Sequence, residues 1–324
     1  MKKKMIILVS IMAIIILVVF TISLIINKNG EVDKEDNKSI SVVTSFYPAY
    51  VLTQNLTDQI PGIKVDSLTD FSAGCLHDYQ LTTNDMKLLA NADVFIINGG
   101  GMEEYLEDVI ASHPKLTVID LSEGITMIES MEHAGEDNPH VWLDPELYTV
   151  QIKNANKGLE QYFMNLDPGS ISGDSGDIID KLNSNANDYL DKALDIVEEM
   201  NQILESVKER ALSNDISNKV VIFHDSFAYL ANKAGLEVAY AVEIDDEHPL
   251  SAGEIAEVID IIKGEGIQYL FTEEQHDGTI SDRIKEETGT EVFIINSAVT
   301  GDGSKDSYIE AMRYNIDTLK EAFK

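Results

Sequence analysis

The chain has 324 residues, of which 44% are hydrophobic, and its 24 basic and 57 acidic side chains give a net charge of -33. This length is sufficient for two domains of ordinary size. The charge excludes nucleic acid as a partner, because phosphate binding requires clustered cationic side chains. Cys75 is the single cysteine, so no intramolecular disulfide can form.

The first residues form a separate segment. Lys2, Lys3 and Lys4 precede an uncharged apolar run over residues 5–26, which as a helix would be about 33 Å long and could cross a bilayer. The cationic flank places the amino terminus in the cytoplasm and the rest outside. No small-x-small site and no cysteine follow the run, so residues 1–27 are interpreted as an uncleaved anchor rather than a signal peptide. A cleaved, secreted form is the alternative.

Residues 28–39 are polar and lack periodicity, as expected of a flexible tether. Short apolar runs then alternate with helical patterns over residues 40–170, which indicates a first lobe with a parallel, doubly wound sheet. The predicted elements are strands at 41–45, 63–68, 94–97 and 116–120, and helices at 47–56, 83–90 and 104–111.

A second lobe is predicted over residues 214–324, and the linking segment 171–213 contains one long amphipathic helix at 177–212. The fold class is therefore α/β, with two doubly wound parallel-sheet lobes joined by one rigid helix and a metal site in the cleft between them. The second-lobe elements are strands at 220–223, 237–242, 267–272 and 292–295, and helices at 226–234, 252–264, 279–288 and 306–323.

Three histidines carry the chemical interpretation. His77, His140 and His224 each follow a short apolar run, and residues at the carboxyl ends of parallel strands face the ligand crevice of such folds. Three converging imidazoles would bind a borderline-soft divalent metal, with zinc preferred. Glu273, after another predicted strand, is the tentative fourth ligand, and water is its alternative.

Other donors receive weaker assignments. His276 follows the same strand as Glu273 and is a fourth candidate histidine. His113, His133 and His248 are not expected to contact the main metal. Cys75 could bind zinc as a thiolate, but a small, partly buried side chain in a tight loop is favoured.

Several stretches of the chain resemble the zinc-uptake group of solute-binding proteins from zinc and manganese ABC importers. The resemblance implies two α/β lobes, a rigid linking helix, a metal in the interlobe cleft, and His77, His140 and His224 as ligands. The matching stretches are Thr44-Ser45-Phe46-Tyr47-Pro48, His77-Asp78-Tyr79 with Asp85, residues 92–99, Asn138-Pro139-His140-Val141-Trp142, residues 223–229, and Asp306-Ser307-Tyr308.

Two departures from the family pattern matter: the first argues against an auxiliary zinc-collecting role for one loop, and the second concerns the choice of metal. Only His133 stands in the acidic loop where many zinc members carry a histidine-rich loop. Manganese-type members have an acid at the His224 position and an aspartate near Asn296. Three imidazoles favour Zn²⁺ over Mn²⁺, and Asn296 is a weaker candidate for the fourth ligand.

The expected function is therefore extracytoplasmic zinc binding, with delivery to the membrane permease of an ABC importer. The protein is expected to be a non-enzymatic monomer, anchored through its N-terminal segment. A manganese- or iron-binding homologue, a zinc-dependent hydrolase and a metal-stabilised adhesin remain alternatives. No His-Glu-x-x-His motif supports the hydrolase.

Overall fold

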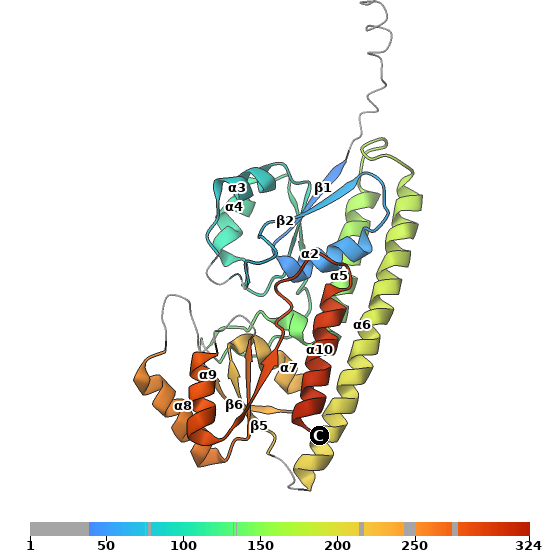
Figure 1. Ribbon diagram of the computed structural model, residues 1–324. Coiled ribbons are helices and arrows are strands. Elements are labelled where there is room, and N and C mark those ends of the chain that lie inside the picture. The colour runs from blue at the N-terminus through green and yellow to red at the C-terminus, as the bar shows by residue number, and fades with distance from the viewer. Residues whose placement is uncertain are drawn as a thin grey trace, which may run out of the picture. The chain divides into compact units, whose positions relative to one another are not determined.

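The computed structural model describes residues 39–74, 76, 79–131, 133, 135–213, 217–242, 250–273 and 278–324 (Figure 1). The predicted anchor and nearly all of the predicted tether lie outside the described residues, as do Cys75, His77, His248 and His276. Within the described ranges, no helix combines the length and apolar character that crossing a bilayer requires.

Two parallel sheets of four strands form the framework, as the sequence predicted. The first sheet has the order β2-β1-β3-β4 and the second has the order β6-β5-β7-β8. All neighbouring strands pair in parallel. The strands are β1 (Ile40–Thr44), β2 (Ile63–Ser67), β3 (Val94–Ile97), β4 (Thr117–Asp120), β5 (Lys219–Phe223), β6 (Glu237–Val242), β7 (Tyr269–Glu273) and β8 (Glu291–Ile295).

Both sheets therefore have the same topology. In each sheet the chain winds to one side after the first strand and then continues on the other side. The resulting switch point lies between β1 and β3 in the first sheet and between β5 and β7 in the second. Open α/β sheets bind ligands at the carboxyl ends of the strands beside such a point.

Helices cover both faces of each sheet, because successive strand residues point to opposite faces and both sets are apolar. In the first sheet, Val43 and Phe95 pack in one cluster while Val42 and Val94 pack in another. The first-lobe helices are α2 (Tyr47–Leu56), α3 (Thr83–Ala90), α4 (Glu107–Ser112) and α5 (Pro145–Met164). The helix predicted over 104–111 begins as a 3-10 turn, Glu104–Leu106, before α4.

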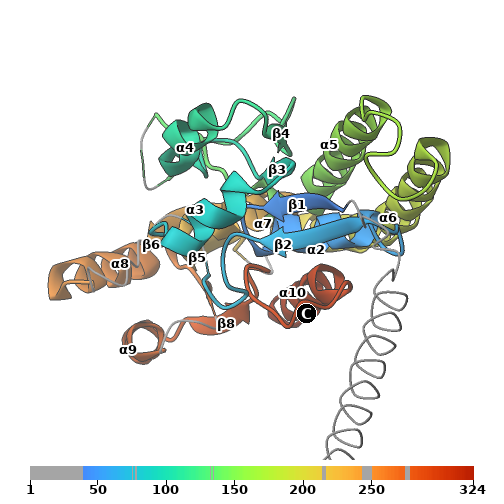
Figure 2. The same ribbon diagram turned by 90° about the horizontal axis from the view of Figure 1, so that it is seen from above.

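The second sheet has the same layering. Val221 and Phe223 pack in one cluster with α8 (Ala252–Glu265) and α9 (Thr279–Thr288). The opposite strand face joins the larger cluster with α7 (Ala228–Lys233) and α10 (Ser307–Ala322). Figure 2 shows α8 and α9 on the side of this sheet away from α10.

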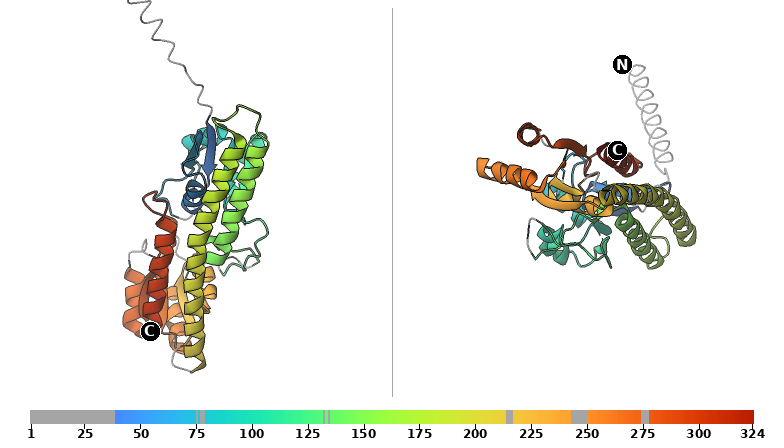
Figure 3. Two further views of the ribbon diagram at one scale, coloured as in Figure 1. Left: turned by 90° about the vertical axis from the view of Figure 1, so that its right-hand side faces the viewer. Right: turned by 90° about the horizontal axis from the view of Figure 1, so that it is seen from below.

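The predicted linking helix is α6 (Ser175–Leu212), with 38 residues. It packs against α2 and α5 of the first lobe and against α7 and α10 of the second. Its buried side chains belong to the large hydrophobic cluster that contains residues of both sheets. A single continuous helix therefore supports both lobes (Figure 3).

The 20-residue helix α5 was not predicted from the sequence. It lies alongside α6 (Figure 3). Its start has recognisable signals: the Asp144 side chain accepts a hydrogen bond from the Glu146 amide, and Pro145 occupies the first turn. Its apolar positions recur every three or four residues, and the buried ones include Tyr148, Ile152, Ala155, Leu159 and Phe163.

A return segment after β8 joins the second lobe to the first. The Trp142 indole N–H donates to the Ser297 carbonyl (2.9 Å), and the Tyr308 hydroxyl donates to the Trp142 carbonyl (2.7 Å). The Tyr47 hydroxyl donates to Ser307 Oγ (2.9 Å) and accepts from the Gly303 amide (3.1 Å). These hydrogen bonds join the two lobes, and the groups that form them are buried or half-buried.

Candidate metal site

His224 lies at the position that the sequence predicted, directly after β5 and beside the switch point of the second sheet. Its amide donates to the Val242 carbonyl at the end of β6 (2.9 Å). Its backbone has φ of 80° and ψ of 131°. A non-glycine residue in this region is strained, and such strain is concentrated at functional sites.

His140 is positioned differently from the prediction. No described strand ends directly before it, since β4 ends at Asp120, and it stands immediately before the 3-10 turn Val141–Leu143 that leads into α5. The expectation that it ends a parallel strand is therefore wrong. Pro139 has no amide hydrogen for a sheet ladder, and Asp144 and Pro145 start a helix four and five residues later. His140 itself is 2% exposed.

The structure nevertheless brings His140 and His224 together. Their ring centroids are 5.0 Å apart, with the planes at 81°. His140 also lies against Trp142, at a centroid distance of 5.2 Å. His77 lies outside the described residues. Among the residues that are described, no three His, Cys, Asp or Glu side chains form a group suited to hold a metal.

Glu273, the tentative fourth ligand, lies beside His224. Its Oε1 is 3.3 Å from His224 Nδ1, and its side chain is buried. The Ser226 hydroxyl donates to Oε1 (3.1 Å) and the Ser297 hydroxyl donates to Oε2 (3.3 Å). A carboxylate in this position can orient an imidazole ligand as well as bind a metal itself.

Asn296 is arranged mainly for local structure. Its side-chain oxygen accepts from the Ala298 amide (2.7 Å), and its own amide donates to Asn315 Oδ1 (2.8 Å). Ala298 has a positive φ of 58°. The Asn296 side chain therefore holds a turn after β8.

A cavity of about 710 Å³ adjoins His140. It is lined mainly by first-lobe residues, together with Asp225 of the second lobe. His133 is one of the lining residues, and its amide donates to Ser130 Oγ (3.0 Å). Glu104, Glu136 and Asp137 make the lining acidic, which favours cations over anions.

Asp225 fastens the loop before His140 to the second lobe. Its Oδ2 accepts from Ser130 Oγ (2.8 Å) and from the Met131 amide (3.1 Å). Tyr229 adds two bonds, since its hydroxyl donates to the Asn138 carbonyl (2.8 Å) and accepts from the Ile128 amide (3.1 Å). In the sequence, Asp225 and Tyr229 are notable only as part of the stretch 223–229 that resembles a family motif. No local pattern indicated that they connect the lobes.

Glu103 is a buried carboxyl group that the sequence analysis also missed. Its two oxygens accept from the Asn98 amide (2.8 Å) and the Gly99 amide (3.0 Å), just after β3. Burial raises the pKa of Glu103 to about 7. Gly99 has φ of 81°, and a Cβ there would overlap the Asp120 carboxylate. The loop beside the first switch point is therefore tightly fixed.

The remaining described histidine has a local role. His113 Nδ1 lies 2.8 Å from the Val109 carbonyl and 2.9 Å from Ser112 Oγ, at the carboxyl end of α4.

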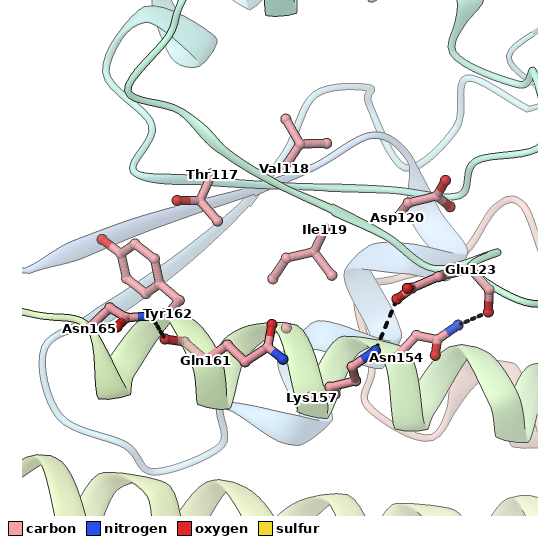
Figure 4. Close-up of a pocket in the computed structure, with 11 residues that line it drawn as sticks. Thr117, Val118, Ile119, Asp120, Glu123, Asn154, Lys157, Gln161, Tyr162 and Asn165 are labelled. Carbon is pink, nitrogen blue, oxygen red and sulfur yellow. Dashed lines mark hydrogen bonds and ion pairs between the residues drawn. The ribbon is translucent and has the colours of Figure 1, made fainter.

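A second cavity, of about 470 Å³, lies between the edge strand β4 and α5 (Figure 4). Asn154 Nδ2 donates to the Leu121 and Glu123 carbonyls, and Lys157 pairs with the Glu123 carboxylate (3.2 Å). Among the described residues that line it, none is a histidine or cysteine. This groove therefore lacks the nitrogen and sulfur donors that zinc prefers.

Comparison with known proteins connects these features to metal uptake. The chain is 28% identical to the iron-binding protein YfeA of Yersinia pestis, over 88% of this chain and 87% of that protein. It is 24% identical to the high-affinity zinc uptake system protein ZnuA of Bacillus subtilis, over 90% of each. The solved structure of FpvC from Pseudomonas aeruginosa in complex with Mn²⁺ superposes with a TM-score of 0.73 at 22% identity, covering 88% of this chain and 98% of that one.

The family model described as "Zinc-uptake complex component A periplasmic" matches residues 42–322, and so includes both sheets, α6 and the candidate site. Members of this family are metal-binding components of transport systems and not enzymes. The chain belongs to this family of solute-binding proteins from zinc- and manganese-type ABC importers.

Proposed function

We propose that this protein binds zinc outside the cytoplasm and delivers it to the permease of an ABC importer. His77, His140 and His224 are the proposed ligands, and Glu273 or water completes the coordination. The site lies between two lobes, residues 40–170 and 214–324, that segment 171–213 joins. The metal is the transported cargo.

The observation that carries the proposal is the approach of His140 and His224. An imidazole nitrogen binds zinc at about 2.0–2.1 Å, which puts the ring centre roughly 3 Å from the metal. Two rings at a tetrahedral angle would then have centres roughly 5 Å apart. The distance between the His140 and His224 ring centroids is 5.0 Å, which fits shared coordination of one ion.

Zinc is proposed over manganese and iron because of the donor set. Imidazole nitrogens suit zinc, whereas manganese prefers carboxylate, carbonyl and water oxygens. The relatives are named for zinc, iron and manganese, so the choice of zinc rests on the three histidines of this chain. A manganese- or iron-binding protein is the alternative.

The proposed location follows from the N-terminal sequence. Residues 5–26 would anchor the protein in the cytoplasmic membrane, with Lys2, Lys3 and Lys4 on the inner side. Residues 28–39 would give the lobes a root-mean-square reach of about 20 Å from the membrane attachment point. Such a tether raises the effective concentration of the binding protein at a neighbouring permease.

Competitive metal binding to the full chain tests the function. The protein is stripped with a chelator, and Zn²⁺, Mn²⁺ and Fe²⁺ are titrated separately and against one another. We expect one zinc ion per chain, bound more tightly than either competitor. Tighter binding of manganese than zinc would contradict the proposal and support the alternative.

A further inference from the structure

Asn138 is a fully buried residue whose side chain contacts both His140 and Asp225, the residue after His224. Its side-chain oxygen lies 3.0 Å from the His140 amide nitrogen and 2.9 Å from His140 Nδ1. Its side-chain nitrogen donates to the Asp225 carbonyl of the second lobe (3.0 Å). One amide group therefore contacts a proposed ligand of the first lobe and the residue after the proposed ligand of the second.

Two of these contacts determine the orientation of the amide. The His140 backbone N–H can only donate, so it must face the Asn138 oxygen. The Asp225 carbonyl can only accept, so it must face the Asn138 NH₂ group. The reversed amide would place donor against donor and acceptor against acceptor in a buried site, which is energetically costly.

This orientation determines which nitrogen of His140 carries hydrogen. A neutral imidazole has one N–H donor and one acceptor nitrogen. Because Nδ1 faces the carbonyl-type oxygen of Asn138, Nδ1 must be the donor. Nε2 is then the basic nitrogen, with the lone pair that a metal requires.

We propose that Asn138 is a positioning residue that holds His140 in the Nδ1–H tautomer and ties this ligand to the second lobe. The inference rests on the proposed function in so far as Nε2 serves as a metal ligand. The tautomer itself is a property of the metal-free protein. Histidine ligands are commonly oriented in this way by a hydrogen bond to their second nitrogen.

The backbone of Asn138 is fixed as well. Its amide donates to the Ile128 carbonyl (2.8 Å), and its carbonyl accepts from the Tyr229 hydroxyl (2.8 Å). Since Tyr229 belongs to α7 of the second lobe, Asn138 makes contacts to that lobe through both its side chain and its backbone. The acceptor for His140 is therefore preorganised before any metal binds.

Nitrogen NMR of the metal-free full chain tests the tautomer directly. Histidine-selective ¹⁵N labelling is combined with long-range proton–nitrogen correlation at about pH 8, where an unperturbed imidazole is neutral. His140→Gln identifies the His140 signals. We expect a protonated Nδ1 and an unprotonated Nε2 in the wild-type protein. An unprotonated Nδ1 of His140 in the wild-type protein would by itself overturn the inference.

Two substitutions separate the two contacts of the side chain. Asn138→Ala removes both, so His140 should lose its preference for Nδ1–H, and zinc affinity should fall roughly 10–100-fold. Asn138→Asp keeps an acceptor for His140 but loses the donor to Asp225, so the Nδ1–H tautomer should persist. A pure Nδ1–H tautomer in Asn138→Ala would show that another group sets it.

Asn185→Ala is the matched structural control. Asn185 is also buried, and its side-chain nitrogen donates to the Leu56 (3.0 Å) and Asp58 (2.8 Å) carbonyls, away from the histidines. This variant should lower stability and leave the His140 tautomer unchanged. Wild-type protein that has the expected tautomer but does not bind zinc would support the positioning inference and contradict the proposed function.

Discussion

The two lobes have the same sheet topology but present their candidate ligands in different ways. In the second lobe, His224 is the first residue after β5, the first strand of its sheet. The corresponding position in the first lobe, after β1, is Ser45, and His140 instead comes from a segment outside the sheet. Equivalent topology therefore predicts where a ligand can be placed but does not predict which segment supplies it.

A buried carboxylate beside each switch point is common to both lobes. Glu103 accepts from two backbone amides after β3 in the first lobe. Glu273 ends β7 in the second lobe and accepts from two serine hydroxyls. The first carboxylate fixes a loop, whereas the second is also within 3.3 Å of His224. A buried carboxyl group therefore has a structural role in the first lobe, whereas in the second lobe it lies next to the candidate metal site.

The largest expected effect is on metal binding, and it tests whether both lobes contribute ligands. Replacing either His140 or His224 with alanine should weaken zinc binding by well over 100-fold, more than is usual for residues that only support ligands. The control is His113→Ala, which should bind zinc normally. In the wild-type protein the His113 ring hydrogen-bonds only to residues at the end of α4 among the contacts described. Competition with a chromophoric chelator measures the affinities. Wild-type affinity in His224→Ala would restrict the site to the first lobe.

The next prediction concerns the pH dependence of the first lobe. Burial raises the pKa of Glu103 from 4.5 to about 7. Because the folded protein holds this proton more tightly than the unfolded chain, the stabilisation is complete below about pH 4.5 and is lost as pH rises through about 7. The shift corresponds to at most about 3 kcal/mol. Urea unfolding of wild type and Glu103→Gln measures it.

The difference in unfolding free energy between wild type and Glu103→Gln should be larger at about pH 5 than at about pH 8. Using this difference cancels the contributions of the other carboxyl groups. A difference that is independent of pH, or larger at the higher pH, would show that the Glu103 carboxyl is not protonated preferentially in the folded state.

These first two predictions differ in how far the sequence supports them. The alternation of short apolar runs and helical patterns was sufficient to predict both sheets, because strands buried on both faces are continuously apolar. The same alternation also predicted the position of His224, because a residue directly after a buried parallel strand lies at the carboxyl edge of the sheet. Glu103 gave no signal, because its burial depends on the packing of the β3 loop against residues distant in the sequence.

His140 illustrates a partial success of the sequence analysis. The expected proximity of His140 to His224 is observed, its role as a ligand stays a prediction, and its assignment to a strand end was wrong. A position between Pro139 and the helix-start pair Asp144-Pro145 offered evidence against a strand. The contacts of Asp225 with Ser130 and Met131 could not be predicted, because their separations of 95 and 94 residues leave no local pattern.

The third prediction addresses the connection between the lobes. Asp225→Ala removes the acceptor for Ser130 Oγ and the Met131 amide, so we expect the free energy of unfolding to fall by about 2 kcal/mol. Asp225→Asn retains an acceptor oxygen and should lose less. Hydrogen exchange at the Met131 amide should accelerate in the alanine variant. Unchanged exchange at Met131 would argue against a role for Asp225 in holding this loop.

The smallest effect compares the backbones of the two histidines. His224 has a φ of 80°, whereas His140 has a φ of -79°. Glycine relieves about 1–3 kcal/mol of strain at a position like His224 but costs about 0.5–1 kcal/mol of chain entropy. His224→Gly should therefore be about 1 kcal/mol more stable than His224→Ala, and His140→Gly should be less stable than His140→Ala.

Thermal unfolding of these four metal-free variants measures the backbone effect without interference from metal binding. The comparison of glycine with alanine at one position cancels the loss of the imidazole ring. Equal stability of the glycine and alanine variants at position 224 would show that the backbone there is relaxed in solution.

The central claim is that one metal ion lies between the lobes and is bound by histidines of both. A crystal structure of the zinc-bound protein, with anomalous data collected on either side of the zinc absorption edge, tests it most directly. We predict a single strong peak at about 2.0–2.1 Å from Nε2 of His140 and from an imidazole nitrogen of His224. A zinc peak that contacts only one lobe, or that lies away from both histidines, would contradict the account.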